Sequence, residues 1–175
     1  MQDKEIIFLD TEFSSLDPYK GEILSIGLVK ENGEELYLEL EHNDEIDDWV
    51  KKHIIPKLKG EKVSREEAKE KIKKFVGKKK PIMMAYVNQF DAIYTYKLFT
   101  IEGNPFFWMP IDFASILFAH GFDPSEYYDK QKQFAKKFGI NAEKFTQHNA
   151  LDDARLLREV YTKLKSESEN LKNKS

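Results

Sequence analysis

Acidic side chains directly follow an apolar run near the start of the sequence. The segment IIFLDTEF (residues 6–13) places Asp10 and Glu12 two residues apart. If the strand continues that far, both carboxylates leave the same face, roughly 7 Å apart along the strand. Two carboxylates so close repel each other unless a cation lies between them, and Mg²⁺ or Mn²⁺ prefers such oxygen ligands. Alone, the D-x-E pattern equally suits solvated acids at an exposed strand end.

A third acid, Asp91, occupies a comparable position in the middle of the sequence. In AYVNQFDAIYTYKLF (residues 85–99), it follows a buried strand and opens a helix whose neighbours are mostly apolar. A lone aspartate at such a position is usually an N-cap. Asn88, three residues earlier, could cap the helix, form a turn or contact a substrate. This segment alone therefore leaves its function open.

A late helix carries two adjacent aspartates, which helical periodicity separates. In QHNALDDARLL (residues 147–157), Asp153 lies four residues before Leu157 and borders the apolar stripe of the helix. Asp152 lies nearer to water and suits the third position of a helix capped by Asn149. We therefore interpret Asp152 as structural and Asp153 as functional. The apolar stripe comprises Ala150, Ala154, Leu157, Tyr161 and Leu164, and the line of Asp152 comprises Leu156, Glu159 and Lys163.

His148 lies in the loop immediately before this helix. A lone histidine in a loop is usually just a polar loop residue. Beside a cluster of acids it becomes a candidate general base, because the ordinary pKa of an imidazole lies near working pH. The interpretation of His148 therefore depends on whether the acids of the three segments meet in space.

Strands and helices must position these side chains, and hydrophobic periodicity predicts both. Residues 31–33 (ENG) supply a tight turn between two strands, which predicts a hairpin. Ser64 and Glu67 predict a capping box at the start of a helix. The predicted strands cover residues 5–9, 22–30, 34–40, 81–86 and part of 106–112, and the predicted helices cover residues 64–76, 91–100, 112–120, 129–138 and 150–165.

The order of these elements predicts the α/β class: a mixed sheet, antiparallel in its first three strands and flanked by helices. The chain has 175 residues, of which 41% are hydrophobic, enough for one globular core. We expect a single domain over residues 1–165 and a polar tail over residues 166–175 that frays.

Composition excludes several classes of function. The sequence has no cysteine, which excludes disulfides, thiolate metal sites and cysteine nucleophiles. No apolar run approaches the roughly 20 residues that span a bilayer, and the first ten residues lack a signal-peptide pattern. We therefore expect a cytoplasmic protein without a membrane partner.

Charge is segregated along the sequence. Residues 1–50 hold 15 acids and 3 bases, and residues 51–80 hold 13 bases and 4 acids. Such asymmetry suits a nucleic-acid partner, although a solvated helix face explains the basic run more simply.

The three acidic segments, taken in order, resemble the three motifs of the DEDDh exonucleases. These are D-x-E after the first strand, N-x-x-[FY]-D after a middle strand and H-x-A-L-x-D-A at a late helix, and the resemblance covers residues 6–157. It implies a ribonuclease H-like (DnaQ-like) fold and removal of nucleotides from the 3′ end of DNA or RNA. It also implies two divalent metal ions, Mg²⁺ or Mn²⁺, and a water activated by His148. The implied metal ligands are Asp10, Glu12, Asp91 and Asp153.

Within that family, the sequence is most similar to the small bacterial exoribonucleases of the mycobacterial type. The segments DTEF, EILSIGLV and WMPIDFASIL carry this similarity. It implies single-stranded RNA as substrate, nucleoside 5′-monophosphates as products and a homodimer as a further partnership. An oligoribonuclease-like enzyme, a DNA-directed exonuclease and an RNA-binding module without catalysis stay open as alternatives.

Residues beside the motifs are candidates for substrate contact. Phe13 and Ser14 stand where proofreading exonucleases carry Thr-Thr, and with Asn88 we expect them to contact the terminal nucleotide. Core packing is an equal alternative for Phe13. We expect the aromatic run at residues 106–109 to be buried, with a base platform or a dimer interface as the alternative. Asp112 suits a helix N-cap.

Overall fold

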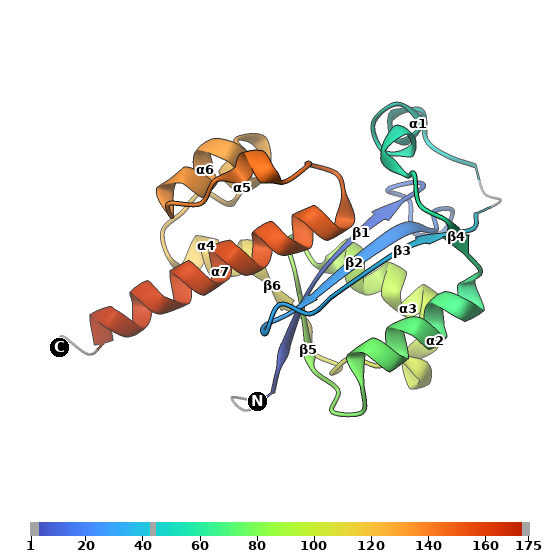
Figure 1. Ribbon diagram of the computed structural model, residues 1–175, viewed down its shortest axis with the longest axis horizontal. Coiled ribbons are helices and arrows are strands. Elements are labelled where there is room, and N and C mark those ends of the chain that lie inside the picture. Colours follow the sequence, from blue (N-terminus) through green and yellow to red (C-terminus); the bar gives the residue numbers. More distant parts are fainter. Residues whose placement is uncertain (1–3, 43–44, 173–175) are drawn as a thin grey trace.

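The sheet has six strands in the described part of the chain, residues 4–42 and 45–172 of a computed structural model. Their order is β4-β3-β2-β1-β5-β6 (Figure 1). β1–β2 and β2–β3 pair antiparallel, as predicted, whereas β5 and β6 run parallel to β1. The strands are β1 Ile6–Phe13, β2 Ile23–Lys30, β3 Glu35–Leu40, β4 Lys62–Val63, β5 Ile82–Ala85 and β6 Ile111–Asp112.

Helices cover both faces of the sheet. The long α7 crosses one face with α4, α5 and α6 on the same side, and α2 and α3 lie on the opposite face (Figure 1). Within the described residues, no helix is both long and apolar enough to cross a lipid bilayer. The helices are α1 Asp48–His53, η1 Ile55–Lys57, α2 Arg65–Val76, α3 Gln89–Gly103, α4 Phe113–Ala119, α5 Pro124–Asp129, α6 Gln131–Lys137, η2 Ala142–Lys144 and α7 Ala150–Lys172.

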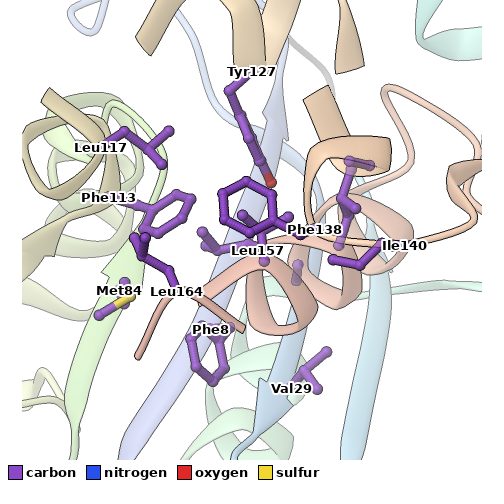
Figure 2. Packing of buried hydrophobic residues seen from close by; sticks show 14 of the residues in the cluster. Phe8, Val29, Met84, Phe113, Leu117, Tyr127, Phe138, Ile140, Leu157 and Leu164 are labelled. Carbon is purple, nitrogen blue, oxygen red and sulfur yellow. The ribbon is translucent and has the colours of Figure 1, made fainter. Parts of the chain in front are cut away.

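Two hydrophobic clusters hold these layers together. Between α7 and the sheet, Phe8 and Met84 pack with Phe113, Leu157 and side chains of α5 and α6 (Figure 2). On the other face, the odd-numbered apolar residues of β1 pack against α2 and α3. Because side chains alternate between the two faces of a strand, Phe8 and the other even-numbered residues of β1 point toward α7.

Several local signals act as predicted. Ser64 Oγ accepts a hydrogen bond from the Glu67 backbone N at 3.2 Å and caps α2, which is one half of the predicted capping box, whereas the Glu67 carboxylate pairs with Lys71. Asp112 Oδ2 accepts from the Ser115 backbone N at 2.8 Å and caps α4. The hairpin turn closes through a hydrogen bond from Gly33 N to Lys30 O at 3.0 Å.

Other boundaries differ from the prediction. The helix expected over residues 129–138 corresponds to α6, which begins only at Gln131 because Lys130 leaves helical geometry (φ −129°, ψ 39°). The separate short helix before it, α5, was not predicted. The last helix continues to Lys172 rather than ending at residue 165, so most of the tail expected to fray is helical. That segment has no glycine or proline to end a helix. Four further short elements, α1, η1, β4 and η2, were not predicted because they are too brief to show a period.

The aromatic run at residues 106–109 is only partly buried. Phe106 is buried, as expected, whereas Trp108 exposes 69% of its surface. Burial therefore explains the first part of this run and leaves Trp108 at the surface.

Candidate active site

A pocket of about 640 Å³ opens where β1 ends and α3 and α7 begin. It is bounded by acidic side chains, by aromatic side chains and by the loop before α7. All five predicted catalytic positions line it: Asp10, Glu12, Asp91, His148 and Asp153.

Asp10 and Glu12 both lie on β1, which continues to Phe13, so the same pleat presents both toward α7. Burial raises the pKa of Asp10 well above its ordinary value, and the charges of Asp153 and Asp91 raise it further. Burial, then Asp153, also raises the pKa of Glu12 to about 8. Both shifts show that negative charge is costly here without a compensating cation.

Asp91 reaches the pocket from the opposite layer, in the first turn of α3. It is not the N-cap, a position that Asn88 occupies without a side-chain capping bond. Thr11 donates to Asp91 Oδ1 from its backbone N (2.9 Å) and from its Oγ1 (2.8 Å). Burial raises the pKa of Asp91 to about 7, and the bonds from Thr11 oppose that rise.

Asp153 projects from the first turn of α7. Its Oδ1 accepts from Gln131 Nε2 (3.0 Å) and its Oδ2 accepts from the His148 backbone N (2.7 Å). Burial raises its pKa to about 6, against the lowering effect of these two bonds. The side chain is thus held in one orientation toward the pocket.

Asp152 serves the start of α7 instead. Its backbone N donates to Asn149 Oδ1 (3.1 Å), the predicted cap, and its carboxylate accepts from Thr146 N (3.0 Å) and Arg155 Nη1 (2.7 Å). It is absent from the residues that line the pocket. One detail was wrong: Leu156, which we placed nearer to water, is fully buried.

The α7 helix begins directly on the backbone of β2. A Cβ atom added to Gly27 would lie 2.3 Å from Ala150 O and 2.5 Å from Leu151 Cα. Gly27 is also the register partner of Asp10. The absence of a side chain at position 27 therefore brings the helix that carries Asp153 close to the strand that carries Asp10.

His148 lies in the loop before α7 with a left-handed backbone (φ 58°). Its ring lies edge-on between Trp49 (5.3 Å between centroids) and Tyr128 (5.7 Å). Burial, then the charges of Lys57 and His53, lower the pKa of His148 to about 4. The imidazole is therefore neutral near pH 7 and able to accept a proton.

The donor set fits a hard divalent cation. Potential ligand atoms of Glu12, His148 and Asp153 all lie within 4.8 Å of one another. Asp10 and Asp91 line the same pocket, which adds two further buried carboxylates. Carboxylate oxygens suit Mg²⁺ and Mn²⁺, whose charge would offset the repulsion that raises these pKa values.

Of the three predicted substrate contacts, Phe13 lines the pocket, whereas Ser14 and Asn88 do not. Phe13 lines the pocket and also stacks on Tyr94, with ring centroids 4.5 Å apart, so it packs against the core and its contact with a nucleotide stays a prediction. Ser14 is fully buried, does not line the pocket, and accepts a hydrogen bond from Glu22 N at 3.0 Å. Asn88 also lies outside the lining, and its backbone N donates to Asp112 Oδ1 at 3.2 Å.

Sequence reasoning missed several residues of the site. Thr11 and Gln131 orient Asp91 and Asp153, and Trp49 and Tyr128 flank His148. Thr11 could have been suspected from its place between two functional acids. The others come from α1, α5 and α6, short elements whose sequences show no motif.

Comparisons with known proteins show the family and the fold of this chain. The model of the exonuclease family RNase_T matches residues 7–161. Exonuclease I of E. coli bound to a dA16 oligonucleotide is similar in structure, with 14% identity and a TM-score of 0.71, over 94% of this chain and 41% of that one. No curated protein matches the sequence.

Two further solved structures are similar. E. coli Exonuclease I with a 5cy-dT13 oligonucleotide gives 13% identity and a TM-score of 0.67, over 96% of this chain and 42% of that one. Exonuclease I of Methylocaldum szegediense is 14% identical with a TM-score of 0.60, and the match covers 93% of this chain and 40% of that one. The chain thus spans about two fifths of these relatives' length, and the likeness confirms the expected DnaQ-like fold.

Proposed function

Since the chain belongs to the RNase_T exonuclease family, we propose that it removes nucleotides from the 3′ end of single-stranded RNA as nucleoside 5′-monophosphates. The observation that carries the proposal is the convergence of four carboxylates and a neutral histidine in one pocket. This is the residue set of the DEDDh enzymes that the sequence resembles.

In the proposed mechanism, Asp10, Glu12, Asp91 and Asp153 would hold two divalent ions. Bound cations would supply Lewis-acid stabilisation of phosphate charge and lower the pKa of the attacking water. His148 accepts a proton from that water as its oxygen bonds to phosphorus. The bond from phosphorus to the 3′ oxygen breaks, and the leaving oxygen takes up a proton to restore the 3′ hydroxyl of the shortened strand.

DNA is the second candidate substrate. The preference for RNA is supported by the sequence resemblance to the mycobacterial-type enzymes. Exonuclease I of E. coli, by contrast, was solved with dA16 and dT13 oligonucleotides. A shared fold at 14% identity does not transfer that substrate to this chain, so the two must be compared directly.

A matched pair of 5′-labelled oligonucleotides tests the proposal. RNA and DNA of one sequence would be incubated with the protein in Mg²⁺, Mn²⁺ or excess chelator, with Asp10→Asn as the inactive control. We expect a ladder shortened from the 3′ end on RNA, 5′-monophosphate products and no reaction in chelator. Faster degradation of DNA would favour the second candidate. Products with 3′ phosphates, or full activity in chelator, would contradict the mechanism.

A further inference from the structure

A lysine close to the acid cluster does not line the pocket. Lys57, the last residue of η1, donates from Nζ to the backbone O of Gln147 at 2.6 Å. Gln147 immediately precedes His148, and Lys57 is absent from the pocket lining. The charge of Lys57 still acts on Glu12, His148 and Asp153, which shows that it lies close to the site.

The segment that carries Lys57 is fixed to the sheet at three places. At its start, Asp47 N donates to Ser14 O at 2.9 Å. In its middle, Val50 and Ile54 pack with Leu24 of β2 in a small separate hydrophobic cluster. Residues 47–60, which include α1 and η1, therefore form a strap that is held to this end of the sheet.

The third attachment is a buried carboxylate. Glu39 on β3 exposes only 3% of its surface. Its Oε1 accepts from Lys59 N and Gly60 N at 3.0 Å each, and from the Tyr37 hydroxyl at 3.0 Å. Three donors on one buried oxygen fix the chain two residues beyond Lys57. The fit is close, because a Cβ atom at position 60 would lie 3.1 Å from Glu39 Oε1.

From this chain of contacts we propose that Lys57 is a positioning residue for His148, anchored by Glu39 and acting through the Gln147 carbonyl. The backbone of His148 has φ 58°, a value that is uncommon for residues other than glycine. Contacts with surrounding residues must hold the backbone in such a conformation. The ammonium of Lys57 supplies such a restraint from one side, and the bond from His148 N to Asp153 supplies the other. The catalytic part of this inference rests on the proposed function.

Lys57→Met tests the restraint, with Lys57→Arg as the conservative variant and Lys52→Met as the matched control. Lys52 is an exposed lysine of the same segment, so its loss changes net charge equally. We expect Lys57→Met to lower kcat roughly 10- to 100-fold, the scale of a small misplacement, with little change in KM. Lys57→Arg should recover most of that loss, and Lys52→Met should behave as wild type.

Amide hydrogen exchange of His148 supplies a readout independent of activity. Its N–H donates to Asp153 Oδ2, so a loosened loop should exchange that proton faster in Lys57→Met than in Lys52→Met. Gly60→Ala keeps Lys57 but crowds the Glu39 carboxylate. Like Lys57→Met, it should speed exchange of the His148 N–H and lower kcat.

The outcomes separate the two proposals. Wild-type exchange and wild-type kcat in Lys57→Met would overturn the positioning role. A raised KM with unchanged kcat would also overturn it, because Lys57 would then bind substrate directly. Faster exchange in a chain that shows no nuclease activity would support the positioning role and refute the proposed function.

Discussion

At the scale of single residues, the main question is whether His148 acts as a general base or as a metal ligand. It lies within the ligand-atom cluster of Glu12 and Asp153, yet its ring is also held between two aromatic side chains. Imidazole suits borderline metals better than hard ones, and carboxylates already surround the pocket. On the chemistry of these donors, we propose that His148 is a proton acceptor rather than a ligand for Mg²⁺.

His148→Ala should therefore keep metal binding and lose about 10²–10⁴-fold in single-turnover rate. Because the pKa of His148 is lowered to about 4, its protonation should slow the wild type only in the acid range, well below the ordinary value of 6.5. Calorimetry with Mg²⁺ and rates measured across pH check both points. Equal weakening of Mg²⁺ binding by His148→Ala and Asp153→Asn would make His148 a ligand instead.

At the scale of elements, α7 directs two neighbouring carboxylates to different surroundings: Asp153 lines the pocket, and Asp152 contacts residues at the start of the helix. Asp153→Asn should abolish turnover and weaken metal binding, because it removes a charge inside the pocket. Asp152→Asn should retain turnover and cost only a fraction of a kcal/mol of stability, since it weakens the contacts with Arg155 and Thr146 at the helix start. Thermal unfolding and metal titration of both variants separate the effects, and equal loss of turnover would contradict the assignment.

The same elements show what sequence periodicity can reveal. The period of two in β1 predicted that Asp10 and Glu12 share a face, and the helical period of α7 predicted which aspartate faces the pocket. Periodicity misplaced Leu156 because α7 is buried over a wider arc than one stripe. The bond from Gln131 to Asp153 depends on how α6 packs, which local sequence does not encode.

At the scale of the whole molecule, the acid cluster should make the metal-free protein less stable as pH rises. The folded-state pKa values of Glu12 (about 8) and Asp91 (about 7) exceed their ordinary 4.5 and 3.8. The folded chain thus keeps protons that the unfolded chain releases. The stabilisation is full below about pH 4 and is lost as pH rises toward about 8.

In chelator, the unfolding midpoint should therefore fall between pH 6 and pH 8. A change of 1 kcal/mol corresponds to roughly 2–4 °C in a chain of this size. Mg²⁺ should raise the midpoint most at pH 8, where the carboxylates are ionised. Asp10→Asn, which removes one of the repelling charges, is the control that should flatten the slope. A midpoint that rises with pH in chelator would contradict the prediction.

The contact between Gly27 and the first residues of α7 limits which sequences can form this site. Because position 27 has no side chain, α7 packs directly on the β2 backbone, and this sets the separation between Asp10 and Asp153, the proposed metal ligands. In a library of all substitutions selected for nuclease activity, position 27 should accept glycine alone. Its buried neighbours Ile26 and Leu28 should accept other aliphatic residues. Recovery of active alanine or serine variants at position 27 would show that α7 can shift away from β2 without loss of nuclease activity.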